Sequence, residues 1–239
     1  MFFILESIVM KQYVVLTLLS FSFFVAQSQE VQDSIVDVNR RYLEDQFYIG
    51  LGYNLLFNRP ENTVQRNLSY NLQAGFIKDI PLNYRRNVGL GIGVGYAVNS
   101  YYSNIVATKT NNIISYEVMD QGDFNRSKLE THAVEFPLEL RWRTSTVEEY
   151  KFWRIYAGVK LGYVFSGRSK LVMEGGSTSF SNDDIQPFQY GLMLNFGYNT
   201  WNIHAYYGLS PLLEETAQLP SGERIDTRVL RIGLIFYIL

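Results

Sequence analysis

Charged residues placed inside otherwise apolar segments are the part of this sequence best suited to chemistry. They are Glu135, Glu139, Arg141, Lys160 and Arg231. Buried carboxylates and cations either pair with one another or mark a path for protons or ions. Because burying an unpaired charge is very costly, we predict a salt-bridge network among these side chains. A structural plug is its favoured role, and a proton or ion path is the alternative.

Histidines and glycines give no catalytic or nucleotide-binding pattern. His132 and His204 are the two histidines, and an alternating strand pattern puts them on opposite faces near opposite ends. No Ser/His/Asp set gathers at one end. The glycines of Gly89–Gly95 lack the GxGxxG spacing of a nucleotide loop. With no cysteine in the chain, thiolate metal sites and disulfides are excluded. We therefore predict no catalytic residue, no cofactor and no metal.

Composition narrows the class of protein. The 239 residues are 47% hydrophobic and 15% aromatic, with a net charge of -2 and a mean hydropathy of -0.07. This hydropathy is too low for a helical membrane protein, and the near-neutral charge favours neither nucleic acid nor a polybasic membrane patch. A mildly polar average with many aromatic residues is typical of an outer-membrane β-barrel.

The first residues have the pattern of an export signal. Residues 1–28 contain a basic start at Met10-Lys11, an apolar run over Tyr13–Ala26, and small residues at the spacing of a cleavage site. That run is shorter than the roughly 18–20 residues that a membrane helix needs. We predict a signal peptide over 1–28 and a polar periplasmic tail over 29–46. Since residues 1–9 fit the pattern poorly, Met10 is an alternative start.

The clearest strand lies at Val88–Val98, which reads VGLGIGVGYAV. Large apolar residues alternate with glycine or alanine, and a period of two is the period of a strand. One face is apolar, and the other suits a narrow lumen in which small residues make room for large ones opposite. We interpret this stretch as a wall strand of a membrane barrel.

Seven further segments alternate in the same way. No charge falls at a mid-strand outward position, where Lys or Arg would cost roughly 2–4 kcal/mol in lipid, and the five charged residues named above all point inward. We predict an all-β fold over residues 47–239, an eight-stranded antiparallel transmembrane (outer-membrane) β-barrel that is OmpA/OmpX-like. Its strands would be Phe47–Leu55, Leu68–Lys78, Val88–Tyr102, His132–Arg143, Ile155–Ser166, Phe188–Tyr198, Trp201–Leu209 and Val229–Leu239.

Loop lengths predict the orientation. Long connections follow the first, third, fifth and seventh strands, and short turns such as Asn199-Thr200 follow the others. Long loops face outside and short turns face the periplasm in this class, so both termini would be periplasmic. Trp142, Trp153 and Trp201 fall beside the short turns with outward parity, which predicts an aromatic girdle at the periplasmic interface.

The loops could bind a partner or simply cover the barrel. Asn99–Glu130 and Gly167–Pro187 are rich in Ser, Asn, Asp and Gly and are expected to be loops outside the membrane. Binding residues concentrate on loops held by a rigid wall. The turns at Lys78–Asn87 and Thr144–Arg154 are charged and aromatic, so they are equally suited to a periplasmic partner.

Several long stretches resemble a known family. They are Phe57–Asn83, Gly95–Asn104, Lys128–Thr146, Tyr150–Lys170, Asn195–Leu209 and Arg231–Leu239. In these stretches the chain resembles the PorT family, outer-membrane β-barrel components of the type IX protein secretion system of Bacteroidota, a system also linked to gliding. The resemblance implies a role in exporting proteins that carry a C-terminal sorting signal, and it implies no catalytic residue.

We therefore predict a non-enzymatic outer-membrane component or assembly factor of this machinery. Its partners would be outer-membrane lipid and other type IX secretion proteins, with no nucleic acid and no small-molecule substrate. The first alternative is an OmpX-like surface barrel for adhesion or envelope integrity, and the second is a barrel enzyme.

Overall fold

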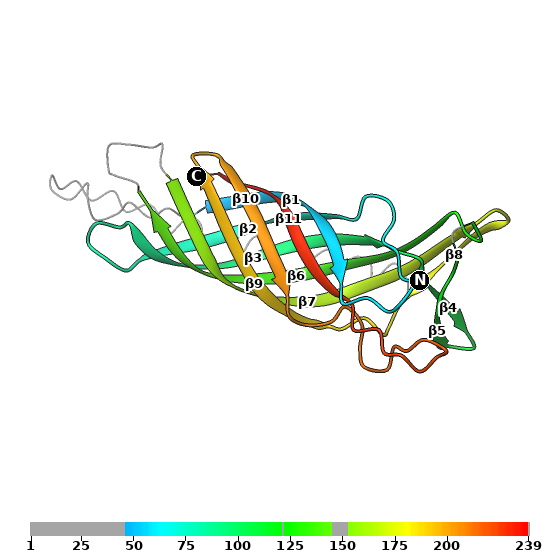
Figure 1. The fold of residues 1–239 in the computed structure, drawn as a ribbon. Helices are drawn as coiled ribbons and strands as arrows, with labels where there is room; N and C mark the ends of the chain where they lie inside the picture. The colour runs from blue at the N-terminus through cyan, green and yellow to red at the C-terminus, as the bar shows by residue number, and fades with distance from the viewer. Residues whose placement is uncertain (1–45, 121, 145–152, 239) are drawn as a thin grey trace, which may run out of the picture. The chain divides into compact units, whose positions relative to one another are not determined.

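A computed structural model describes residues 46–120, 122–144 and 153–238 of the chain. The predicted signal peptide (1–28) and nearly all of the predicted tail (29–46) lie outside these residues. No helix in the described part is long and apolar enough to cross a membrane. Eleven strands run in chain order as β1 Gln46–Phe57, β2 Tyr70–Pro81, β3 Val88–Tyr102, β4 Ile105–Thr110, β5 Ile113–Val118, β6 Arg126–Arg143, β7 Trp153–Met173, β8 Gly176–Ser181, β9 Phe188–Tyr198, β10 Trp201–Gly208 and β11 Arg228–Ile238 (Figure 1).

Eight of these strands close into a barrel. The hydrogen-bonded order is β6-β3-β2-β1-β11-β10-β9-β7, and β7 pairs with β6 to complete the ring. The first and last strands pair antiparallel from Phe47↔Ile238 to Phe57↔Arg228. Closure leaves no sheet edge inside the membrane region. The predicted eight-stranded antiparallel barrel is confirmed.

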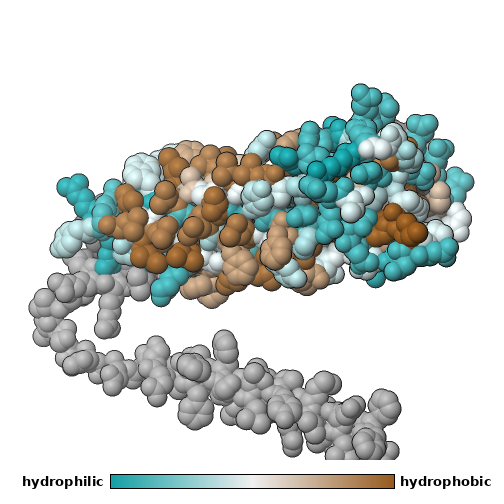
Figure 2. All heavy atoms as spheres, turned by 90° about the horizontal axis from the view of Figure 1, so that it is seen from below, coloured by the Kyte–Doolittle hydropathy of each residue, from teal (hydrophilic) through white to brown (hydrophobic). Residues whose placement is uncertain are grey.

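The outward faces of the strands are apolar and exposed. Leu51 on β1 lies opposite Leu72 on β2 and Leu234 on β11, and the side chains of Leu51 and Leu72 are both about half exposed. Figure 2 shows the result as a brown band between two teal ends. A soluble protein rarely exposes so large an apolar patch, whereas a barrel in lipid requires one.

Strand positions agree closely with the predicted alternation. β3 and β9 have the predicted bounds, and the side chains of Tyr198 and Trp201 flank the two-residue turn at Asn199, which has a φ of 54°. Most of the turn predicted at Thr144–Arg154, residues 145–152, lies outside the described residues.

The two segments predicted as long loops contain strands that the sequence analysis does not predict. β6 begins six residues before His132, and β7 continues seven residues past Ser166, so the two strands remain paired beyond the barrel. β4 and β5 form a separate hairpin, and β8 pairs with the extension of β7. Pairing satisfies backbone groups that these segments would otherwise leave open. Asn111 and Asn112 supply the positive φ values that the β4–β5 turn needs.

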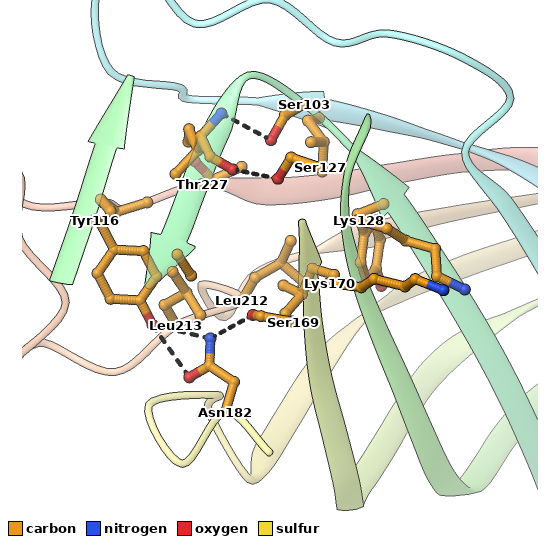
Figure 3. Close-up of a pocket in the computed structure, with 16 residues that line it drawn as sticks. Ser103, Tyr116, Ser127, Lys128, Ser169, Lys170, Asn182, Leu212, Leu213 and Thr227 are labelled. Carbon is orange, nitrogen blue, oxygen red and sulfur yellow. Dashed lines mark hydrogen bonds between the residues drawn. The ribbon is translucent and has the colours of Figure 1, made fainter. Parts of the chain in front are cut away.

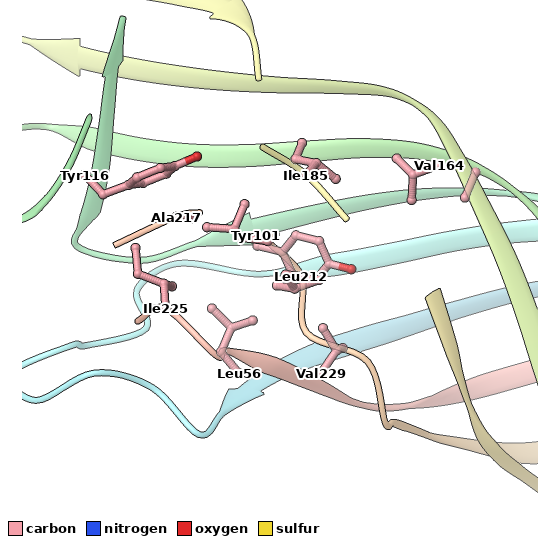
Figure 4. Close-up of a cluster of buried hydrophobic side chains, with 11 residues drawn as sticks. Leu56, Tyr101, Tyr116, Val164, Ile185, Leu212, Ala217, Ile225 and Val229 are labelled. Atoms are coloured by element: carbon pink, nitrogen blue, oxygen red, sulfur yellow. The ribbon is translucent and has the colours of Figure 1, made fainter. Parts of the chain in front are cut away.

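A hydrophobic cluster organises the end of the barrel that carries the long connections, which we call the long-loop end. The β10–β11 connection packs against residues of the barrel and of the β4–β5 hairpin (Figure 4). Its buried side chains are Leu212, Leu213, Ala217 and Ile225. Burying several aliphatic side chains at roughly 1.5–3 kcal/mol each fixes such a connection in place. The long-loop end is therefore an ordered cap. We call the opposite end, with the β2–β3 and β9–β10 connections, the short-turn end.

Candidate functional site

The lumen holds an ion-paired group near its middle. Oε2 of Glu135 lies 2.9 Å from Nζ of Lys160, and Oε1 of Glu135 lies 3.5 Å from Nη1 of Arg231. Lys160 also donates a hydrogen bond to Oε1 of Gln73, at 2.7 Å. All of these side chains are buried. One carboxylate thus contacts two cations in a site that water barely reaches.

Arg231 is held by neutral partners as well. Its Nε donates to Oδ1 of Asn54 at 3.0 Å, and its Nη2 donates to Oδ1 of Asn99 at 2.7 Å. The guanidinium also lies 5.1 Å from the centre of the Tyr206 ring. The planar fork of arginine suits such a fixed set of acceptors, so strands β1, β3, β10 and β11 are tied together across the lumen.

A second charged group lies nearer the short-turn end. Asp79 accepts from Nη1 of Arg141 at 3.1 Å and from Nη2 of Arg143 at 2.7 Å. Nε of Arg141 lies 3.0 Å from Oε2 of Glu139, and its guanidinium lies 4.5 Å from the centre of the Tyr156 ring. The ion pairs of this group join Asp79, Glu139, Arg141 and Arg143.

A short polar chain continues from Glu139. Its Oε1 accepts from Nδ2 of Asn195 at 3.2 Å, and Oδ1 of Asn195 lies 2.6 Å from Nδ1 of His204. His204 is buried in the lumen, whereas His132 faces outward and contacts the Tyr96 hydroxyl at 2.6 Å. The two histidines therefore lie on opposite faces of the wall, as expected from the strand alternation.

Sequence reasoning placed five charged residues in the lumen and missed three more that are buried there, Asp79, Arg143 and Arg154. Asp79 was assigned to a turn, but β2 continues to Pro81. Alternation carried forward from Gln73 and Ile77 would have placed Asp79 inward. The omission of Asp79 from the predicted network matters because its carboxylate contacts two of the five buried cations.

The lumen has little free space. Cavities of about 20 Å³ beside Arg231 and about 10 Å³ beside His204 lie within it, and each is comparable to the space of a single water. A Cβ added to Gly95 would lie 2.0 Å from the hydroxyl of Tyr48. The glycine-lined face of β3 therefore makes room for this tyrosine, in agreement with the interior of small barrels.

The three tryptophans lie on the outer wall at the short-turn end. Trp142, Trp153 and Trp201 are all at least two-fifths exposed. Trp153 and Trp201 each pair with Tyr198 in the strand register, and the rings of Trp153 and Tyr198 lie 5.1 Å apart. This is the arrangement that an interfacial girdle requires, and lipid contact at these rings stays a prediction.

The cap at the long-loop end encloses a cavity of about 50 Å³ (Figure 3). Leu212 and Leu213 line it, and the Tyr116 hydroxyl lies 3.1 Å from both Asn182 Oδ1 and Asp184 Oδ2. Burial raises the pKa of Tyr116, so its phenol stays protonated and can donate. The cavity is far smaller than the roughly 300–1,000 Å³ of sites for drug-sized ligands. No group of three or more metal-ligating side chains occurs in the described part of the chain.

A comparison with protein families agrees with this architecture. A family model described as "Outer membrane protein beta-barrel domain" matches residues 25–214. Among solved structures, the attachment invasion locus protein Ail of Yersinia pestis is similar at 17% identity and a TM-score of 0.33, over 80% of this chain and 97% of that chain. A mutant porin of Rh. blastica matches at 10% identity and a TM-score of 0.15, over 82% and 100%. No curated protein matches.

Proposed function

We propose that this chain, which belongs to the outer membrane protein β-barrel domain family, is a non-enzymatic component or assembly factor of the type IX protein secretion and gliding machinery. It would act through contacts with other proteins of that machinery. The resemblance of Phe57–Asn83, Lys128–Thr146 and Tyr150–Lys170 to the PorT family supports this assignment.

The filled lumen is the observation that carries the proposal. Ion pairs around Glu135 and Asp79 occupy the interior, and the cavities beside them are of water size. An eight-stranded barrel has room for side chains rather than for a diffusion pore. A barrel with such an interior does not pass an exported protein through itself, so its work falls to the surfaces at its two ends.

The proposed orientation puts the long loops outside and the short turns, with both termini, in the periplasm. Residues 1–28 would be removed on export, and 29–46 would form a periplasmic tail. The three tryptophans beside the short turns support this arrangement, as do the long ordered connections at the other end.

A periplasmic contact is favoured by one exposed aromatic residue. Tyr84, in the turn between β2 and β3, is 99% exposed, and Leu82 beside it is 56% exposed. Aromatic side chains are enriched at protein–protein interfaces, and a tyrosine with no packing of its own gives the fold no stability. We therefore assign Tyr84 to a contact with another secretion protein.

Gene deletion and complementation test the function. Loss of the gene should abolish surface delivery of proteins with a C-terminal sorting signal, and the wild-type gene should restore it. Tyr84→Ala should restore it only in part, whereas the control Tyr207→Phe, on the barrel wall, should restore it fully. Normal secretion in the deletion strain would refute the proposal.

The OmpX-like alternative is favoured by β8. In the described sheet β8 pairs with β7 alone, so its other edge is open to strand addition by a host or matrix protein. Thr178→Lys on this exposed strand should weaken adhesion under this alternative and leave sorting-signal secretion unchanged.

A further inference from the structure

We propose that the outward face of the β6–β7 extension binds a phosphorylated glycolipid headgroup of the outer leaflet. The surface, which we call the basic ladder, consists of Arg126 and Lys128 on β6 with Arg168 and Lys170 on β7. The inference takes from the proposed function only the orientation that puts the long loops outside.

The basic ladder brings like charges together. Lys128 lies directly opposite Lys170 in the strand register, and Arg168 lies opposite Glu130. Figure 3 shows the Lys128 and Lys170 side chains running side by side. Directly opposite residues have Cβ atoms about 4.5–5.5 Å apart, and like charges at that spacing are destabilising. An anion bound between the two ammonium groups would offset this repulsion.

Most of these cations have no anionic partner among the residues that the structure describes. Lys128 contacts Glu130, but none of the described carboxylates forms an ion pair with Arg126, Arg168 or Lys170. Four cations against one carboxylate leave a net charge of +3 on the ladder. A single phosphodiester would neutralise only one of these charges. The surface therefore fits a ligand with more than one phosphate, which arginine can bind in bidentate fashion.

The height of the ladder matches a headgroup. Phe165 on β7 lies with Tyr96 and His132 in an outward aromatic group, the Phe165 and Tyr96 rings being 6.2 Å apart. Arg168 and Lys170 follow Phe165 by three and five residues, which is roughly 10 and 17 Å along a strand. A strand tilt of about 35–45° reduces this to roughly 7–13 Å above the aromatic group, where the polar layer of the leaflet lies.

An open groove beside the ladder gives room for the rest of such a lipid. It has a volume of about 560 Å³, and Leu68, Tyr70, Tyr102, Arg126 and Val172 contribute to its lining. Tyr102 lies opposite Lys128 in the register. Leu68 is 69% exposed. A groove with apolar and aromatic walls and a cationic border fits an amphiphile whose charged part reaches the ladder.

Native mass spectrometry of the refolded full-length protein in neutral detergent, titrated with diphosphorylated lipid A, tests the proposal. The double variant Arg168→Gln/Lys170→Gln should lower lipid affinity by about fivefold for each cation removed. Glu130→Gln should raise it, because the carboxylate that competes for Lys128 is gone. The control Arg224→Gln removes an exposed cation from the β10–β11 connection and should leave affinity unchanged.

Three results would overturn the inference. They are an unchanged affinity in the double variant, an equal loss in Arg224→Gln, and equal binding of dephosphorylated lipid A or of phosphatidylglycerol. A shift in electrophoretic mobility on heating verifies that each variant is folded. Because the assay uses purified protein, its outcome is separate from that of the secretion assay in cells.

Discussion

The ammonium of Lys160 on β7 lies 2.9 Å from the carboxylate of Glu135 on β6, and both side chains are less than a tenth exposed. Lys160 stands opposite Pro137 in the register, one diagonal step from Glu135. Because water barely reaches either charge, each is stabilised by the other. This pair therefore holds the two strands that close the barrel in a single register.

Lys160→Met should destabilise the barrel by about 3 kcal/mol, toward the lower end of the cost of breaking a buried pair, because Arg231 still contacts Glu135. Urea unfolding in vesicles measures this. The double variant Lys160→Met/Glu135→Gln should be less destabilised than the sum of the two single variants. The control Arg224→Met removes an exposed pair with Glu215 and should change stability by less than about 1 kcal/mol. Equal losses of stability in Lys160→Met and Arg224→Met would contradict the account.

Asp79→Asn should destabilise the barrel at least as much as Lys160→Met, by about 3–5 kcal/mol. The substitution leaves the guanidinium groups of Arg141 and Arg143 without the carboxylate that contacts both. Asp183→Asn is the matched control, because Asp183 pairs with Lys109 in an exposed position. Urea unfolding in vesicles measures the stability of both variants. Equal unfolding midpoints for Asp79→Asn and Asp183→Asn would show that the contacts of Asp79 with the two arginines add no stability.

Gly95→Ala should cost about 1–3 kcal/mol through overpacking, because the new methyl group would collide with the Tyr48 hydroxyl. Tyr48→Phe in the same chain should recover part of the loss by removing the nearest atom. Gly175→Ala meets no atom within 4 Å and should be neutral. If Tyr48→Phe gives no recovery, the close approach of β3 to Tyr48 is not the cause.

The protein should give no steady ionic current in planar lipid bilayers, because the spaces beside Arg231 and His204 are of single-water size. A purified porin in the same bilayer serves as the positive control. Stable current steps that vanish in Arg231→Gln would instead support the ion path, which is the alternative to a structural plug.

The pKa of Glu130, on the part of β6 that extends past the apolar band of the barrel, is held below its usual value, chiefly by the hydrogen bond from Lys128. Its contribution to stability is therefore complete above the ordinary carboxyl range and is lost as the pH falls through the lowered pKa. A carbon-detected NMR titration should find this low midpoint, and Lys128→Met should raise it. Lys109→Met, on β4, should leave it unchanged.

Much of the fold could be predicted because lipid imposes a period of two on every wall strand. Runs such as Val88–Val98 alternate without a break, and the inward charges fell where alternation placed them. The extension of β7 to Met173 and the pairing of β8 could not be predicted in the same way. Outside the membrane both faces of a strand meet water or other loops, so the alternating signal is lost.

The candidate site shows the same division. Glu135, Lys160 and Arg231 could be assigned to one lumen because their strands alternate clearly. Asp79 follows the same alternation, but it lies close to polar residues around Leu82 and Asn83 that resemble a turn, and its contact with Arg143 could not be predicted. Which inward charges pair depends on strand stagger around the closed barrel, and a sequence read strand by strand does not contain it.

Tryptophan fluorescence in vesicles of brominated lipids tests the central claim, that lipid covers the apolar outer wall. The three tryptophans of the chain all face outward at the short-turn end, so bromines near the headgroups should quench their emission strongly and bromines at the chain ends should quench it weakly. Emission from the folded protein that is the same in brominated and ordinary lipids would contradict the account.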